Sequence, residues 1–489
     1  MIKINNIPKE IKQISEVVWE LPASYKKGMR VPARIYASKE LLQGMDAGVF
    51  DQLTNVACLP GIQKHAYCMP DGHWGYGFPI GGVAAFDPEK GVISPGGIGF
   101  DINCGMRLIT TNLTIDEVKP KLNSLIDLLF ERVPTGVGGK GFLRITENQF
   151  KDIMVDGASW CVENGYGWKE DTKRIEENGK IKGADPTRVS DRAIKRGIRQ
   201  MGTLGSGNHY LEVQMVKAEN ILRPDIAKKF GIINPDQIVI MVHCGSRGFG
   251  HQIGTDYLTT FNKVMKDLDL GVKDRELACA PFKSKEGQNY YKAMACAANA
   301  AFVNRQVILH RVRESFSQIF KKEPEDMDMK LIYDVAHNIA KVEKHKIDGV
   351  KQEVVVHRKG STRSFGPGHP DLNSLYKEVG QPVILGGSME TGSYLLVGTD
   401  KAMEETFGST AHGSGRTMSR TKAKQMVNGE CLQREMAAKG IYVKSASMTG
   451  LAEEAGFAYK DVSEVVSVLE KADISRGVVA LKPIGNIKG

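Results

Sequence analysis

The sequence predicts an α+β fold, in which a single compact domain of mixed β-sheets is flanked by helices. Short apolar runs alternate with longer charged segments of helical spacing, which is the pattern of strands interleaved with helices. The hydrophobic content of 41% is ample for a core, and no long repeat or Pro/Gly/Ser-rich linker divides the chain. We therefore expect one domain over residues 1–489, with a helical polar insert or flap at about residues 140–200.

The bulk composition excludes several classes of protein. Lys and Arg number 66 against 57 acidic residues, and the net charge of +9 modestly favours an anionic partner such as nucleic acid or a nucleotide. No apolar run approaches the roughly 18 residues that a membrane span requires. The polar start and the absence of a C-x-x-C pair among the 8 Cys residues favour reduced thiols and a cytoplasmic location.

Helices are expected in two regions of the first 200 residues. The stretches 8–21 and 38–46 carry apolar residues at three-to-four spacing, so residues 1–50 are predicted to be a mostly helical lead-in. The segment 113–200 is charged and helical in pattern. Near its end, cations recur at steps of four, three, one and three, at Arg188, Arg192, Lys195, Arg196 and Arg199. This spacing places five cations on one helical face, which is either a solvated surface or a contact surface for phosphates.

A glycine-rich turn contains the first candidate metal ligands. In SPGGIGFDINCGMR, Asp101 and Cys104 lie three positions apart, where flexible backbone can bring both side chains to one point. A thiolate and a carboxylate together suit a transition-metal ion. The alternative is a buried thiol beside an Asp that caps a turn.

Three histidines at predicted strand ends favour the metal interpretation. GTLGSGNHYLEV leads into a strand at His209, an apolar run in IVIMVHCGSRGFGH ends at His243, and LIYDV ends near His337, after which a helix is expected. A lone histidine is usually a satisfied core or surface residue. Three at strand ends, together with the Asp/Cys pair, indicate a shared metal site.

Small-residue loops suggest phosphate binding. VILGGSMETGSYLLVG and GSTAHGSGRTMSR offer free N–H groups, the second beside His412 and Arg416, although ordinary tight turns explain most such loops. Neither is a Walker loop, and GVGGKG at 136–141 lacks the required spacing. In MPDGHWGYG, Asp71 and His73 are either an Asx turn and a surface histidine or part of a site, with Asp71 contacting substrate or a metal-bound group.

Together these motifs resemble the RtcB family of RNA-splicing ligases. The match runs from about residue 20 to the end and is carried by MPDGHWGYGFPIGG, GGIGFDINCGMR, GTLGSGNHYLEV, VHCGSRGFGH, DVAHNIAKVE, GGSMETGSYL and TAHGSGRTMSR. The resemblance implies a ligase that joins RNA 2′,3′-cyclic phosphate or 3′-phosphate ends to 5′-hydroxyl ends, with GTP and Mn²⁺, through a guanylylated histidine. It also implies archaease as an activating partner.

The resemblance assigns roles to individual residues. The implied nucleophile is His412, and the implied ligands of two manganese ions are Asp101, Cys104, His209, His243 and His337, with Cys104 as the bridge. The implied GTP pocket comprises Asn208, His209, Tyr210, Leu211, Glu212, His337, Asn338, Gly386, Gly387, Ser388, Met389, Ser393, His412, Gly413, Ser414, Gly415, Tyr459 and Lys488. The RNA-binding candidates are Asp71, Arg188, Arg192, Lys195, Arg196, Arg199, Arg247 and Arg416.

Three rival functions stay open. Lys346-Ile-Asp-Gly349 resembles the lysine motif of ATP- or GTP-dependent ligases and capping enzymes, but it also fits a tight turn that leads into a strand. A dinuclear metallophosphoesterase would use the metals without a nucleotide, and a non-catalytic RNA-binding protein would leave them idle. The sequence does not distinguish tRNA splicing from RNA repair.

Overall fold

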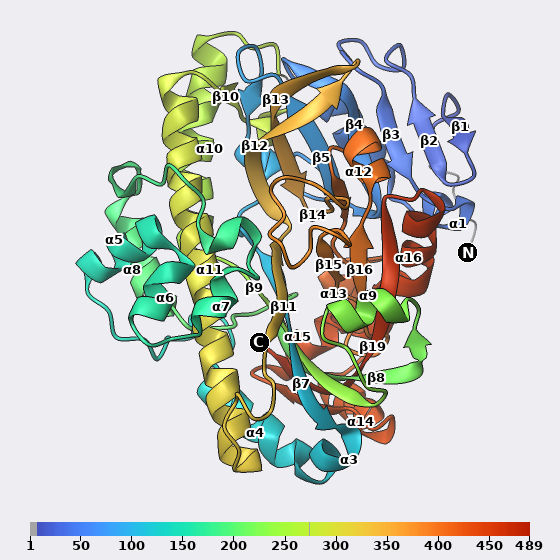
Figure 1. Cartoon of the computed structure of the whole chain (residues 1–489). Coiled ribbons are helices and arrows are strands. Elements are labelled where there is room, and N and C mark those ends of the chain that lie inside the picture. The colour runs from blue at the N-terminus through green and yellow to red at the C-terminus, as the bar shows by residue number, and fades with distance from the viewer. Residues whose placement is uncertain (1–6, 273) are drawn as a thin grey trace.

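Two mixed β-sheets contain most of the strands (Figure 1). The structure is a computed structural model that describes residues 7–272 and 274–489. In the first sheet the strand order is β1 (Lys12–Ser15), β2 (Val18–Leu21), β3 (Ala33–Tyr36), β4 (Ile62–His73), β5 (Ile80–Phe86), β13 (Val350–Lys359) and β12 (Asn338–Ile347). Among the described strands of this first sheet, only β3 and β4 pair in parallel. This mixed sheet confirms the α+β prediction.

The second sheet carries the strands that end at the candidate site. Its order is β11 (Leu331–Ala336), β7 (Gly105–Thr114), β9 (Gln237–Cys244), β8 (Tyr210–Ile221), β19 (Ser475–Lys488), β16 (Ser393–Gly398) and β15 (Pro382–Leu385), and β18 (Tyr442–Ser445) pairs with β19 in parallel. The predicted strands before His243 and after His209 are therefore present. Strands far apart in the chain become neighbours in this sheet, so their ends meet.

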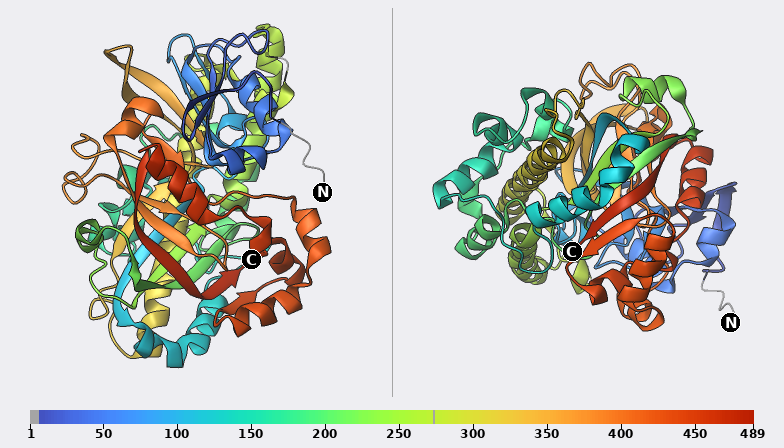
Figure 2. Two further views of the ribbon diagram at one scale, coloured as in Figure 1. Left: turned by 90° about the vertical axis from the view of Figure 1, so that its right-hand side faces the viewer. Right: turned by 90° about the horizontal axis from the view of Figure 1, so that it is seen from below.

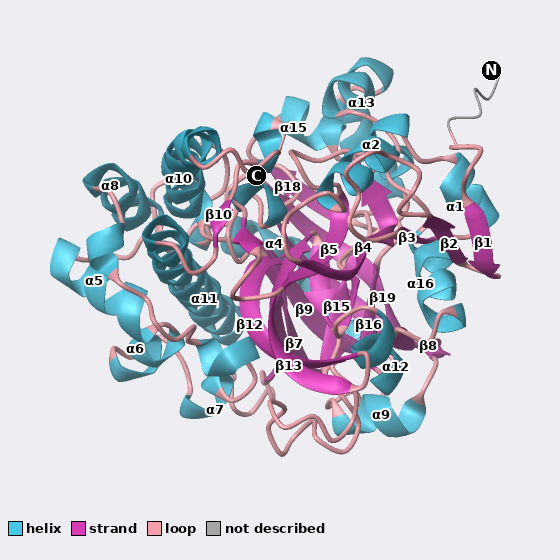
Figure 3. Cartoon of the chain, turned by 90° about the horizontal axis from the view of Figure 1, so that it is seen from above, coloured by secondary structure: helices cyan, strands magenta, loops and turns pink. Residues whose placement is uncertain are grey.

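A 36-residue helix, α11 (Lys285–Phe320), runs along the sheets. Its alanine-rich middle is buried on all sides, as expected for a helix enclosed by other elements. Helix α10 (Arg247–Asp267) packs beside it (Figure 3). None of the helices in the described parts of the chain has the length and apolar character to cross a membrane.

The segment predicted as a polar insert is helical. Its helices are α5 (Glu147–Asp156), α6 (Ala158–Glu163), α7 (Lys169–Thr172) and α8 (Asp191–Gln200). Helices α5, α6 and α8 lie on the far side of α11 from the sheets (Figures 1 and 3). Asn299 of α11 donates hydrogen bonds to the carbonyls of Met154 and Ile181, at 2.8 and 3.2 Å. The segment is thus packed onto α11, and movement as a flap stays a prediction.

The predicted helix at 8–21 is wrong. Within the described residues this stretch forms the hairpin β1–β2, whose second strand continues the sheet by pairing with β3. Val17 and Leu21 are buried, and the indole of Trp19 donates to the carbonyl of Ala37 at 2.8 Å. Pairing with an existing sheet outweighs the weak helical preference of a short amphipathic segment. The expected helix at 38–46 is present as α1 (Lys39–Gln43).

The helix expected after His337 is also wrong, because residues 338–347 form strand β12. From Lys341 to Ile347 buried and exposed residues alternate, with Lys341, Glu343 and His345 buried and Val342 exposed. The buried members are polar, so hydrophobicity did not reveal the two-residue period. Glu343 accepts two hydrogen bonds from Arg358 on β13, at 2.6 and 2.8 Å, which compensates for its burial.

A small C-terminal lobe covers one end of the second sheet. It consists of α13 (Arg420–Met426), α14 (Gly429–Ala438), β18 and α15 (Met448–Glu453), which are drawn in orange and red in Figure 2. Leu432, Met436 and Leu451 form its own apolar cluster. The lobe brings residues 453–459 over the loops that follow β15 and β17 (Ser409–Ala411).

Candidate active site

The five candidate metal ligands converge at one end of the second sheet. Cys104 immediately precedes β7, His209 precedes β8, and His337 follows β11. In the register of the sheet, His243 on β9 lies opposite both Met106 and Tyr210, so the neighbouring strands present their ligands at one level. The adjacency of β11, β7, β9 and β8 is therefore what assembles the cluster.

The cluster divides into two groups that share one thiol. Cys104, His243 and His337 form one group, and Asp101, Cys104 and His209 form the other, with ligand atoms within 4.8 Å of one another in each group. Sγ of Cys104 lies 3.3 Å from Nε2 of both His209 and His243. Sulfur, nitrogen and carboxylate donors around two adjacent points fit a pair of transition-metal ions with Cys104 between them.

The protonation states of the histidine and cysteine ligands bear on metal binding, because a metal ion binds a neutral imidazole and a thiolate. Burial, reinforced by the neighbouring histidines, lowers the pKa of His243 and His337 well below the usual range, so both imidazoles are neutral. Burial and the Asp101 carboxylate raise the pKa of Cys104. A cation between these groups would displace the thiol proton and relieve the repulsion.

A second layer of contacts orients the ligands. Nδ1 of His209 lies 3.0 Å from the carbonyl of Leu204, which directs Nε2 toward Cys104. The buried guanidinium of Arg305 donates to the carbonyls of Asn103 and Cys244, at 2.7 and 2.8 Å. These carbonyls adjoin Cys104 and His243, so one side chain of α11 supports two ligand segments.

His412 is held by Asp71, a residue 341 positions away. Nδ1 of His412 lies 2.6 Å from Oδ2 of Asp71, and the same oxygen accepts the backbone N–H groups of His412 and Gly413, at 3.1 and 3.3 Å. Asp71 has no exposed surface. This corrects the prediction of a direct RNA contact, because the carboxylate lies beneath the imidazole and orients it.

A cavity lies on one side of His412, and we call it the nucleotide-side cavity after the predicted GTP pocket. Most residues predicted to bind GTP line it: Asn208, Tyr210, Gly386, Gly387, Ser388, Met389, His412, Gly413, Ser414, Gly415, Tyr459 and Lys488. Met106 and Glu454 also line it and were not predicted as binding residues. His73, which the sequence left open as part of a site, lines it too. The contribution of Glu454 comes from the C-terminal lobe, which no local motif indicates.

Several predicted GTP residues lie elsewhere. Leu211 alternates with Tyr210 along β8 and is fully buried in the core. Glu212 and Ser393 lie behind the pocket lining, where Gln214 donates to both, at 2.6 and 3.3 Å. Burial raises the pKa of Glu212 to about 7. His209, His337 and Asn338 line the neighbouring cavity on the metal side instead.

Arg416, predicted to bind RNA, also lines the nucleotide-side cavity, and its contact with RNA stays a prediction. Its Nη1 donates to the hydroxyl of Tyr459 at 3.0 Å, and its guanidinium lies 4.9 Å from the centroid of that ring. Glu454 accepts from Nζ of Lys488 at 3.2 Å. Arg416, Tyr459, Glu454 and Lys488 therefore form a connected polar wall around the cavity.

The second cavity is lined by the candidate metal ligands and by several basic residues, and we call it the metal-side cavity. Arg196, Gln200, Arg247 and Arg420 line it together with His412 and the candidate metal ligands. On α8, Arg192, Lys195, Arg196 and Arg199 are the cations that the helix carries. The predicted fifth cation of this face, Arg188, lies in the turn before the helix and pairs with Asp185 at 3.2 Å. The helical face therefore carries four cations.

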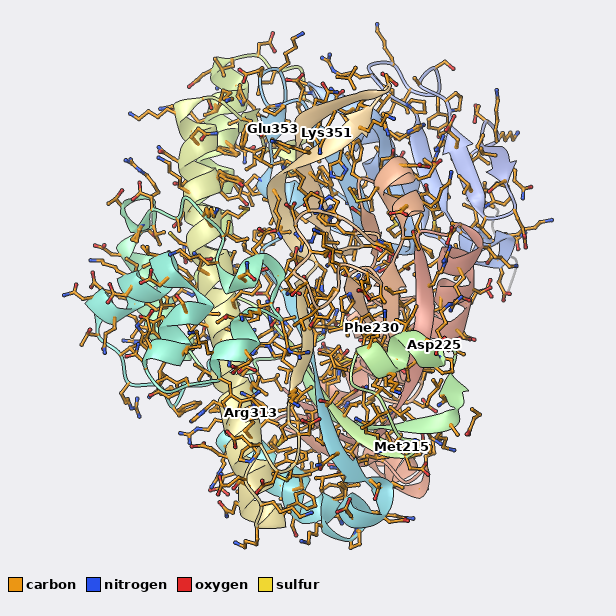
Figure 4. All side chains as sticks on the ribbon, in the orientation of Figure 1. Met215, Asp225, Phe230, Arg313, Lys351 and Glu353 are labelled. Carbon is orange, nitrogen blue, oxygen red and sulfur yellow. The ribbon has the colours of Figure 1, made fainter. Side chains whose placement is uncertain are left out.

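The rival nucleophile, Lys346, lies far from these cavities in the fold. It pairs in register with Lys351 on the β12–β13 hairpin, and Figure 4 labels Lys351 at the outer end of that hairpin. The turn at Asp348-Gly349 confirms the prediction of a tight turn into a strand. Lys346 is exposed and lines neither cavity.

Comparison with known proteins identifies the family. The family model for the tRNA-splicing ligase RtcB matches residues 52–489. The tRNA-splicing ligase RtcB of Methanococcus maripaludis is 54% identical over 479 residues, which cover 98% of this chain and 99% of that protein. Those of Thermococcus kodakarensis and Archaeoglobus fulgidus are each 52% identical, covering 98% and 99% of this chain and 99% and 100% of theirs.

These matches define the chain as an enzyme of the RNA ligase class. It belongs to the RtcB family.

Proposed function

We propose that this enzyme joins RNA ends bearing a 2′,3′-cyclic phosphate or a 3′-phosphate to RNA ends bearing a 5′-hydroxyl, with GTP and two Mn²⁺ ions. The reaction passes through a guanylylated His412 and serves tRNA splicing, RNA repair or both. The RNA ligase class of the chain supports the substrate, and the two ligand groups that share Cys104 support a metal pair. Manganese itself rests on the family resemblance, because these donors bind Zn²⁺ or Cu²⁺ more tightly.

The position of His412 carries the proposal. Its imidazole lines both cavities, and its ring centroid lies 4.7 Å from that of His337. Because the Asp71 carboxylate only accepts hydrogen bonds, Nδ1 carries the proton and Nε2 keeps its lone pair. An unprotonated Nε2 at the junction of a nucleotide pocket and a metal cluster is suited to attack phosphorus.

The chain supplies orientation and charge at each step. Nε2 of His412 attacks the α-phosphorus of GTP, pyrophosphate leaves, and Asp71 stabilises the resulting imidazolium. The RNA 3′-phosphate then takes the GMP from His412. Attack by the 5′-hydroxyl oxygen on the activated phosphate forms the phosphodiester and releases GMP. The metal ions, held by Asp101, Cys104, His209, His243 and His337, would stabilise charge on phosphate oxygens and acidify the water that opens a cyclic phosphate.

The surrounding residues divide between the two substrates. Asn208, Ser388, Gly413, Ser414 and Lys488 line the GTP side. Tyr459, which lines the same cavity, would lie against the guanine. Arg196 and Arg247, with the remaining cations of α8, receive RNA phosphates on the metal side. Archaease is a further proposed partner, as an activator.

Labelled GTP tests the proposal. With α-labelled GTP and Mn²⁺ we expect a covalent adduct that His412→Ala abolishes and Lys346→Ala retains. His412→Ala should still join RNA that already carries a 3′-guanylyl cap, because His412 acts before that stage. A dinuclear phosphoesterase or a non-catalytic RNA-binding protein would form no adduct, and label mapped to Lys346 would refute the assignment of His412.

A further inference from the structure

His73 has a defined hydrogen-bonding character that the steps above do not use. It ends β4 and lines both the nucleotide-side and the metal-side cavity. Its Nδ1 lies 2.9 Å from the backbone oxygen of Asp71. Since a carbonyl oxygen only accepts, Nδ1 carries the proton and Nε2 of the neutral ring is an acceptor. Among residues 7–272 and 274–489, the chain provides no hydrogen-bond partner for Nε2.

The turn that carries His73 is held on both sides. Nζ of the buried Lys460 donates to the carbonyl of Pro70 at 3.0 Å and to that of Gly72. The side-chain amide of Gln52, on α2 (Ala47–Val56), bonds both the carbonyl and the N–H of Gly75, at 2.7 and 3.1 Å. The His73 ring is therefore placed before any ligand arrives.

The surroundings keep the His73 ring neutral. Burial lowers its pKa to about 4, and the charge of Lys460 acts in the same direction. A neutral ring with Nδ1–H already engaged has only a lone pair to offer. It cannot donate to a phosphate oxygen, but it can accept from a hydroxyl. His73 is thus suited to a hydrogen-bond donor such as a sugar hydroxyl and not to a phosphate oxygen.

We propose that His73 binds the 2′-hydroxyl of the 3′-terminal ribose of the RNA strand that receives GMP. This inference rests on the proposed function. The 2′-carbon adjoins the carbon that bears the 3′-phosphate, so any pose that brings this phosphate to His412 also brings the 2′-hydroxyl close to the cavity junction. The ribose hydroxyls of GTP are more remote, because its α-phosphate is attached through the 5′-oxygen. His73 would then favour RNA over DNA at the 3′ end.

Two substitutions at His73 separate its two nitrogens. His73→Asn retains an amide N–H for the Asp71 carbonyl but has no acceptor at the Nε2 position, whereas His73→Gln places an amide oxygen near that position. The substrates are two 3′-phosphate RNA strands that differ only in whether the last sugar is ribose or 2′-deoxyribose. The measurement is kcat/KM for transfer of GMP to each strand.

The unaltered enzyme should prefer the ribose-ended strand by about fivefold to tenfold, the value of one hydrogen bond. His73→Asn should bring the ratio close to one, and His73→Gln should restore most of it. The ratio is taken within each protein, so a general loss of activity does not affect it.

Equal rates on the two strands in the unaltered enzyme, or a preference that survives in His73→Asn, would overturn the inference. It would also be overturned if His73→Asn changed the discrimination between GTP and 2′-deoxy-GTP instead, because the hydroxyl would then belong to the nucleotide. Failure of the unaltered enzyme to form any adduct with labelled GTP would reject the proposed function itself.

Discussion

At the scale of single residues, the contact between Asp71 and His412 determines which nitrogen would react in the proposed mechanism. One buried oxygen of Asp71 accepts from Nδ1 and from two backbone N–H groups, so it fixes both the tautomer of His412 and the loop that carries it. In the proposed mechanism the carboxylate also faces the imidazole that would become positively charged when Nε2 forms a bond to phosphorus. Its negative charge would then act mainly in the transition state.

Asp71→Asn tests this charge with little change in shape. We expect adduct formation with labelled GTP to slow by about a hundredfold or more, since a neutral amide stabilises the imidazolium poorly. GTP binding, measured at equilibrium, should change much less. Joining of RNA that already has a 3′-guanylyl cap should persist, and a parallel loss of that activity would contradict an action through His412.

Cys104 belongs to both ligand groups, so its removal should affect both metals. We expect Cys104→Ala to lose most of the bound manganese at both sites, and with it guanylylation and joining. Metal content after gel filtration measures this directly. Cys431→Ala, at an exposed thiol, is the control and should retain the metal. A Cys104→Ala protein with normal metal content would exclude the bridging role.

The sequence indicated the candidate metal ligands better than the residues that support them. Asp101, Cys104, His209, His243 and His337 each lie in a recognisable glycine-rich turn or at a strand end. The partner of His412 could not be located in this way, because Asp71 and His412 meet only through folding. Glu454 and the buried Arg305 likewise lie in no recognisable motif. Their neighbouring residues in the sequence indicate only a charged side chain on or beside a helix.

At the scale of elements, α8 carries four cations, of which Arg196 lines the metal-side cavity. Phosphate binding by this helix would have a defined salt dependence. Replacing Arg192, Arg196 and Arg199 by Ala should weaken RNA binding about equally for all sequences. The slope of log affinity against log salt should become shallower by about 0.7 for each phosphate of a single strand that the variant no longer neutralises.

Arg188→Ala is the matched control for this surface, because Arg188 lies outside α8 and pairs with Asp185. It should leave the slope unchanged, and guanylylation without RNA should survive in all these variants. A salt slope that does not change in the triple variant would return α8 to the role of a solvated surface.

The two mistaken elements have different physical causes. For β1–β2, a short amphipathic stretch takes the conformation that an adjacent sheet can pair with. For β12, buried ions replace the expected apolar residues, so the pattern of burial does not follow hydrophobicity. Both strands form because of contacts with residues that are distant in the sequence, and a short stretch of sequence does not show these contacts.

At the scale of the whole molecule, the fold class could be predicted but the strand order could not. Short strands interleaved with helices predict an α+β domain, whereas the adjacency of β11, β7, β9 and β8 joins segments from residues 105 to 336. That adjacency places the ligand-bearing ends together. The order is fixed by long-range packing, including a buried ionic cluster between α11 and the second sheet.

Asp334 on β11 is the centre of this cluster. Its carboxylate, fully buried, accepts from Nε and Nη2 of Arg305, both at 2.8 Å, and from Nε of Arg107 on β7 at 2.7 Å. Asp334→Asn would leave two buried guanidinium groups without a counter-charge. We expect a loss of about 3–5 kcal/mol in the free energy of unfolding at neutral pH.

The effect of Asp334→Asn should depend on pH in a definite direction. Burial alone would raise the pKa of Asp334, but attraction to Arg305 and Arg107 outweighs it and lowers that pKa. The carboxylate therefore contributes stability that is fully present above its unfolded pKa, about 3.9, and is lost as pH falls through the lower folded pKa. Denaturant midpoints measured from pH 3 to 7 should show a constant difference between the unaltered protein and Asp334→Asn above about pH 5, and a difference that narrows below about pH 4.

The control is Glu378→Gln, at an exposed ion pair with Lys229, which should scarcely move the denaturant midpoint at any pH. A gap that stays constant down to pH 3 would mean that Asp334 is not the charge that ties α11 to the sheet.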